Sequence, residues 1–222
     1  MGNMQETRIV LPSPGQLLTP GVTILLSLMV AGFIGFLTVP NTVINLLALD
    51  PQKVIHGSVW QLVTYPFVES CPWRLISNGL ILLFIGSAIE REWRRASFIW
   101  LWLVVSIGCA ILWVLINLVA GIYAIGFGAT ACCYGLVATM GVILRGRQFL
   151  VFFTTVAAQY LAIGLIVIGV IVSLPVPITL IWAAGALVAY GYIKARWAVA
   201  ARTSAHPALR RSTGKGQFVD LD

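Results

Sequence analysis

Long apolar runs separated by short polar segments dominate this chain. The first run, residues 21–39, lies between two prolines, and a shorter second run, residues 75–89, lies between two charged residues. A helix needs about 20 apolar residues to cross the hydrocarbon core of a bilayer. Each run therefore predicts one membrane-spanning helix, the second of them short.

The next 49 residues, 96–144, contain no charged side chain. This length is too great for one crossing and suits two. The glycine-rich segment 121–128 predicts the break, because glycine tolerates irregular backbone. A fifth run covers residues 149–174, and Pro175 and Pro177 separate it from a sixth at 178–192. The pattern predicts an all-α membrane protein with six transmembrane helices.

Composition agrees with this pattern. The 222 residues are 59% hydrophobic and 9% charged, whereas a soluble domain has about 25% charged residues. A water-soluble fold is thereby excluded, and no room is left for a separate soluble domain. We expect a cytoplasmic N-terminal segment at 1–20, a membrane domain at 21–196 and a basic cytoplasmic tail at 197–222.

The net charge of +7 could suggest nucleic acid, but the cations lie at the ends of the apolar runs, where membrane topology requires them. Twelve of the 14 lysines and arginines fall on one side of the predicted membrane, and only Lys53 and Arg74 on the other. We therefore expect both termini to be cytoplasmic and no nucleic acid to be bound. The expected location is a bacterial cytoplasmic (inner) membrane.

Small residues recur at four-residue spacing in two of the predicted helices. The fourth contains Ala131 and Gly135, and the sixth contains Gly185 and Ala189. This spacing lets two helix backbones approach closely. We expect the fourth and sixth helices to pack together.

The first outer loop, residues 50–73, is too apolar for a solvated loop and too interrupted to span. Its aromatic residues suit the interface between lipid and water; they are Trp60, Tyr65, Phe67 and Trp73. We expect a half-submerged structure. The four cysteines, Cys71, Cys109, Cys132 and Cys133, match no zinc spacing, so we expect no metal and no cofactor.

Four segments share motifs with a known family. Residues 60–67 match a Trp-Arg-x-x-Thr-x-x-Phe stretch except for Gln61, and Asn78 is followed by Gly86 and Glu90 in a Gly-x-x-x-Glu pattern. Residues 128–136, which include Gly128 and Tyr134, resemble Gly-x-Ser-Gly-x-x-Tyr/Phe-Gly-Leu, with Thr130 and Ala131 at the Ser and Gly positions. Residues 182–189 resemble His-x-x-Gly-x-x-x-Gly/Ala, with Trp182 at the His position. In this order the segments resemble the rhomboid family of intramembrane proteases.

The resemblance implies a rhomboid-like helical bundle with a cavity, a catalytic serine on helix four and a histidine base on helix six. Here Thr130 stands at the serine position, Trp182 at the base and Arg74 at a helix-two histidine, while Asn78 is kept. A weak hydroxyl nucleophile needs an adjacent base, and tryptophan cannot accept a proton. The two histidines, His56 and His206, lie outside every predicted helix. We therefore expect no catalytic residues, as in a pseudoprotease.

Arg74 leaves two interpretations open. Its guanidinium could fill the former oxyanion pocket and bind a partner's carboxylate or a lipid phosphate. It could instead extend to the outer headgroups from its position at a helix end, and this second interpretation is favoured.

Three hypotheses for function follow. The first is a scaffold, assembly factor or accessory subunit that binds the transmembrane helices of another protein, with membrane lipids as the other partners. The second is an atypical active protease that uses Thr130. The third, a transporter, is disfavoured because the predicted spans show no ionisable residue and no inverted repeat.

Overall fold

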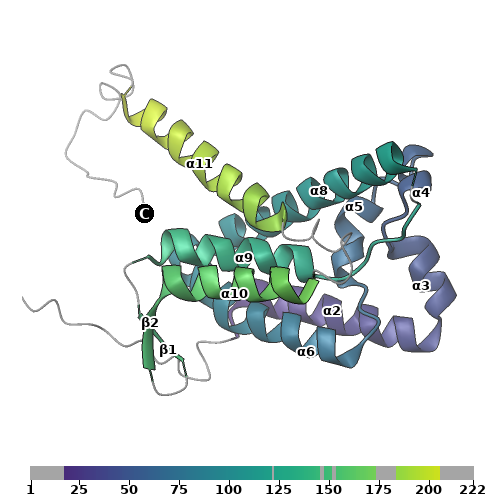
Figure 1. The fold of residues 1–222 in the computed structure, drawn as a ribbon, viewed down its shortest axis with the longest axis horizontal. Helices are drawn as coiled ribbons and strands as arrows, with labels where there is room; N and C mark the ends of the chain where they lie inside the picture. The colour runs from purple at the N-terminus through teal and green to yellow at the C-terminus, as the bar shows by residue number, and fades with distance from the viewer. Residues whose placement is uncertain (1–17, 122, 146–147, 152–153, 174–183, 206–222) are drawn as a thin grey trace, which may run out of the picture.

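The computed structural model describes residues 18–121, 123–145, 148–151, 154–173 and 184–205. These residues are mostly helical (Figure 1). Within them, three helical stretches are long and apolar enough to cross a membrane: α2 (Pro20–Thr38), the stretch Pro72–Trp93 and α8 (Arg95–Ala120). Two shorter apolar helices, α9 (Thr130–Ile143) and α10 (Ala158–Ser173), lie beside them. The described residues establish a helical membrane protein but not six crossings.

The loop predicted to be half-submerged is a series of short helices. Within residues 50–73 they are α4 (Pro51–Ile55), α5 (Gln61–Thr64) and a 3-10 turn, η1 (Tyr65–Phe67), and the helix α3 (Pro40–Leu47) precedes them. Proline occupies one of the first two positions in α2, α3 and α4, where its fixed φ favours the helix and no backbone bond is lost.

Hydrogen bonds hold this loop against α8. The Ser106 hydroxyl donates to the carbonyl of Leu62 at 2.9 Å, and the Tyr65 hydroxyl donates to the carbonyl of Ser106 at 3.2 Å. Burial raises the pKa of the Tyr65 phenol well above its usual value, so the hydroxyl keeps the proton that it donates. Tyr65 is thus buried, contrary to the interfacial position expected for it. Trp60 and Trp73 are exposed, as expected.

The second span is longer than the predicted run 75–89. It consists of α6 (Pro72–Ile81), a π-helical turn, η2 (Leu82–Gly86), and α7 (Ser87–Trp93). Gly86 lets this span approach two others, because a Cβ atom there would lie 3.1 to 3.3 Å from the side chains of Leu82, Val22 and Phe98.

Glu90 joins this span to the start of α2. Its buried carboxylate accepts hydrogen bonds from the Thr19 hydroxyl at 2.5 Å and from the backbone N–H groups of Gly21 and Val22 at 2.8 and 3.0 Å. The first N–H groups of a helix have no partner within the helix, and a negative charge there is favourable. Glu90 therefore caps α2 across the bundle rather than its own helix.

The charge-free stretch 96–144 divides as predicted. It forms α8 and α9, and the break falls at Gly121, which adopts the left-handed conformation at the end of α8. The antiparallel pair of hydrogen bonds between Leu49 and Gly126, 2.8 and 2.9 Å, ties the connecting segment to the chain after α3.

The predicted limits of the last two helices are wrong. Residues expected to begin the fifth helix form a hairpin of β1 (Gln148–Val151) and β2 (Thr154–Ala157), and α10 begins at Ala158. The aromatic and β-branched residues of this segment suit a strand. The sixth helix, α11 (Ala184–Ala205), continues past residue 192, because alanine, lysine and arginine are all good helix formers. The expected tail at 197–222 therefore begins inside α11. Residues 178–183 lie outside the described residues.

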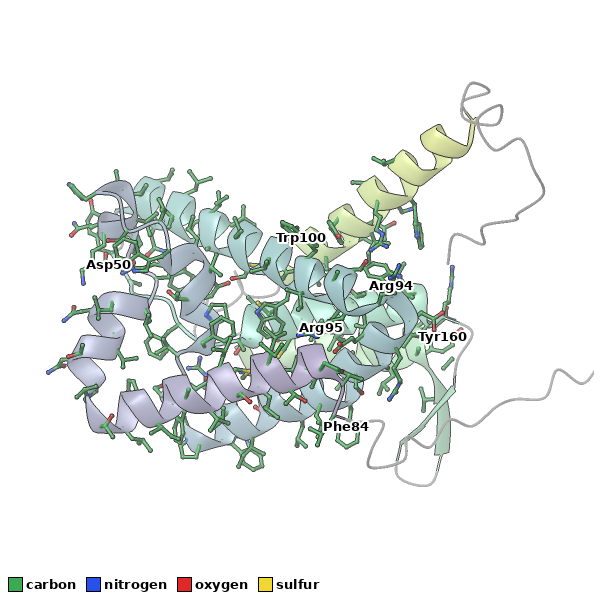
Figure 2. All side chains as sticks on the ribbon, turned by 180° about the vertical axis from the view of Figure 1, so that it is seen from behind. Asp50, Phe84, Arg94, Arg95, Trp100 and Tyr160 are labelled. Carbon is green, nitrogen blue, oxygen red and sulfur yellow. The ribbon has the colours of Figure 1, made fainter. Side chains whose placement is uncertain are left out.

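The bundle has two distinct ends (Figure 2). Asp50 lies at one end, with the short helices of the loop, while Arg94 and Tyr160 lie at the other. The guanidinium carbon of Arg196 lies 4.6 Å from the centre of the Trp93 ring, and the Arg145 Nε atom lies 2.6 Å from Gln159 Oε1. We call the end with Asp50 the loop end, and the end with Arg94, Arg145 and Arg196 the basic end.

Candidate functional site

Thr130 is the first residue of α9, and the turn before it sets its position. Gly128 has φ = +106°, a conformation that favours glycine, and its N–H group donates to the carbonyl of Tyr65 at 3.0 Å. A Cβ atom on Gly128 would also collide with the Arg74 guanidinium. The turn therefore requires glycine for its conformation, and a side chain there would also displace the Arg74 guanidinium.

Asn78 reaches Thr130 from α6. Its side-chain Nδ2 atom lies 3.4 Å from the Thr130 Oγ1 atom, a long hydrogen bond. The same Nδ2 atom donates to Glu69 Oε1 at 2.8 Å. The structure thus brings together the two residues that the sequence placed in one site.

Glu69 is the residue that the sequence analysis missed. Its side chain is fully buried, and besides Asn78 it accepts a hydrogen bond from the backbone N–H of Ala129 at 3.0 Å, next to the start of α9. A negative charge is favourable at a helix N-terminus. The signal available in the sequence was a lone carboxylate in an apolar segment, which must find donors if it is buried.

Arg74 completes the cluster from one turn before Asn78. Its Nε atom lies 3.4 Å from Glu69 Oε2, an ion pair without hydrogen-bond geometry. Its terminal nitrogen donates to the Phe127 carbonyl at 2.9 Å, and its guanidinium carbon lies 5.6 Å from the centre of the Phe127 ring. The favoured interpretation of Arg74 was wrong, because the side chain pairs inward instead of extending to headgroups.

A cavity of about 150 Å³ lies beside this cluster. Asn78 and Ile81 of α6, Leu165 of α10 and four residues of α9 line it; these are Thr130, Cys133, Tyr134 and Val137. Three of the residues proposed for the site, Asn78, Thr130 and Tyr134, therefore share one cavity. Its remaining walls are apolar.

The small residues allow α11 to lie directly against α9. A Cβ atom on Gly185 would collide with the carbonyl oxygen of Ala131, and one on Gly135 would lie 3.3 Å from the carbonyl oxygen of Gly185. Ala189 is fully buried. This is the close approach of two backbones that the spacing of small residues predicted.

Other proposed site residues lie elsewhere. Trp60 donates from its indole nitrogen to the Leu46 carbonyl at 2.9 Å in the loop, while Gly86 and Glu90 pack the second span on its neighbours. These residues support the bundle and do not line the cavity.

Among the described residues, the side chain that hydrogen-bonds the Thr130 hydroxyl is the Asn78 amide, and no imidazole lies beside it. Of the described residues, only His56 has an imidazole, and it lies exposed at the end of α4 with its Nδ1 atom 2.7 Å from the Gln52 carbonyl oxygen. Trp182 and His206 lie outside the described residues. The cluster does hold an ionisable pair, Glu69 and Arg74, just before the predicted second run, and both charges have internal partners.

Comparison with known proteins places the chain in a family. Residues 22–195 match the family model described as eukaryotic integral membrane protein (DUF1751). No curated protein matches the sequence. The expected bacterial inner membrane is therefore wrong, because the family is eukaryotic. Since the match covers more than half of the sequence and nearly all of the described bundle, the chain belongs to this family of eukaryotic integral membrane proteins.

Proposed function

We propose that this protein is a rhomboid-like bundle of six membrane helices that has lost the catalytic dyad and binds a transmembrane segment of another protein. It would act as a scaffold, assembly factor or accessory subunit of a membrane complex. The order of elements supports this proposal: a first span, a loop of short helices, a second span with Asn78, and a later helix that starts at Thr130.

The observation that carries the proposal is the cavity between α6, α9 and α10. Ile81 and Leu165 come from the two different helices, α6 and α10, that flank its α9 wall. Apolar side chains on both of these helices are exposed; they are Ile76 and Leu80 on α6, with Phe84 on the η2 turn that follows it, and Ile163, Leu165 and Val167 on α10. An apolar helix entering between α6 and α10 would meet matching surfaces and one polar spot, formed by Asn78 and Thr130.

Loss of cleavage is supported by the bonding of the cluster. The Asn78 amide, which in an active site would be available to a substrate oxygen, is held by Glu69 at 2.8 Å. When catalytic groups act as a unit, removing one of them lowers the catalytic rate by several orders of magnitude. A polar spot of fixed donors suits recognition, since interhelical hydrogen bonds stabilise membrane helix association by about 0.6 to 2 kcal/mol.

Photocrosslinking tests the binding proposal. A photoreactive amino acid in place of Leu165, which lines the cavity, should crosslink to the transmembrane segments of one or a few proteins in cells. The same replacement at Trp100 of α8, which is 62% exposed and is not part of the cavity lining, serves as the control. Crosslinked proteins identified by mass spectrometry should be specific to position 165. Identical sets of weak adducts at both positions would contradict the proposal.

The alternative, proteolysis by Thr130, rests on the hydroxyl that lines the cavity beside Asn78. Under the scaffold proposal, Thr130→Val removes one of the two polar groups of the polar spot and should lower partner crosslinking by about threefold or more. It should change no cleavage product. Loss of a defined product of a partner in the Thr130→Val cells, measured by immunoblotting, would instead establish the protease.

A further inference from the structure

A larger cavity, of about 540 Å³, lies at the basic end between α9, α10 and α11. Figure 1 shows α11 diverging there from α9 and α10, so that the cavity is a groove between them. None of the residues of the candidate site lines it. It is a second cavity, and of the residues used in the proposed function only Ile163 lines it.

Two cations line this groove without carboxylates. Arg145 follows α9 and donates from Nε to the neutral Gln159 side chain at 2.6 Å, while Lys194 of α11 lies 5.5 Å from the centre of the Tyr190 ring. Both side chains are exposed. Within the part of the chain that the structure describes, neither forms an ion pair and the groove lining contains no Asp or Glu. Among the described residues, the groove lining therefore carries a charge of +2 with no counter-charge in it.

The other walls divide into two kinds. Tyr160, Tyr190 and Trp197 are exposed aromatic residues of the type that gathers where hydrocarbon meets headgroups. Ala162, Ile163 and Ile166 on α10 provide an apolar wall. A ligand that matches all of these has a negative headgroup, a polar junction and long apolar chains.

We propose that this groove binds an anionic phospholipid, with its phosphate and headgroup charge on Arg145 and Lys194 and an acyl chain along Ile163 and Ile166. Exposed apolar residues alone would fit any lipid. The concave shape and the paired cations provide the preference for a negative headgroup, since each lysine or arginine near an anionic surface favours binding by about fivefold.

Quenching of tryptophan fluorescence by brominated lipids tests the proposal on the full chain in lipid nanodiscs. The signal of Trp197, which lines the groove, is isolated as the difference from Trp197→Phe. Brominated phosphatidylserine should quench it at lower mole fraction than brominated phosphatidylcholine. In Arg145→Gln/Lys194→Gln the apparent association of phosphatidylserine should fall by about 30-fold, from two cations together.

Two further variants keep the test falsifiable. Arg94→Gln/Arg95→Gln removes the same charge outside the groove lining and should change the association by less than about twofold, while Arg145→Lys/Lys194→Arg keeps the charge and should retain the preference. Equal quenching by both lipids in the native protein, or an equal loss in the control variant, would overturn the proposal. Displacement by soluble glycerophosphoserine would also overturn it, because the site would then be one for a free phosphate ester.

Discussion

Replacing Gly185 by alanine should destabilise the protein by about 3 kcal/mol, at the upper end of the range for an overpacked interior. The added Cβ atom would collide with the Ala131 carbonyl oxygen, and a backbone atom cannot move aside as a flexible side chain does. The α9 and α11 backbones would have to separate. Thermal unfolding in detergent should show a midpoint lower by roughly 10 °C.

The same helix provides a matched control. A Cβ atom on Gly191 would meet no heavy atom within 4 Å, so Gly191→Ala makes the same chemical change in open space. Its midpoint should stay or rise slightly, because alanine is favoured over glycine in helices by about 1 kcal/mol. Equal midpoints for the two variants would mean that α9 and α11 are not in contact at Gly185.

The sequence predicted those elements whose limits are set by strong local signals. The start of α2 at a proline and the division of residues 96–144 at Gly121 were predicted because a spanning helix has a limited length and glycine permits a break. The hairpin β1–β2 was not predicted, since a short apolar run is compatible with either helix or strand. The pairing of Gln148 with Ala157 depends on backbone bonds that hydropathy does not report.

The candidate site was predicted only in part, for a related reason. The motif placed Asn78 and Thr130 together, and they lie 3.4 Å apart. The direction of the Arg74 side chain depends on Glu69, and the position of Glu69 depends on Ala129, which is 60 residues away in the sequence. Such a tertiary contact leaves no periodic pattern. The position of Arg74 at a helix end was therefore consistent both with a side chain that extends to the headgroups and with one that forms an internal ion pair.

Replacing Glu69 by alanine should have the second large effect, a loss of about 3 to 5 kcal/mol in stability. The fully buried carboxylate has three partners: the Asn78 amide, the Ala129 N–H and the Arg74 guanidinium. Alanine would remove the counter-charge of the half-buried Arg74 and the carboxylate acceptor of the Asn78 and Ala129 donors. The measurement is equilibrium unfolding in mixed detergent micelles, followed by tryptophan fluorescence.

A double-mutant cycle separates the ion pair from the hydrogen bonds. Arg74→Ala removes the cation but leaves the fully buried Glu69 carboxylate bound to Asn78 and Ala129. If the two charges interact, the double variant should lose less stability than the sum of the two single variants. Glu69→Gln keeps one acceptor oxygen without the charge, so its stability should lie between that of the native protein and that of Glu69→Ala. Strict additivity would mean that the 3.4 Å contact between Arg74 and Glu69 contributes no coupling. The carboxylate would then act through its two hydrogen bonds alone, as the anchor that fixes the start of α9 beside α6.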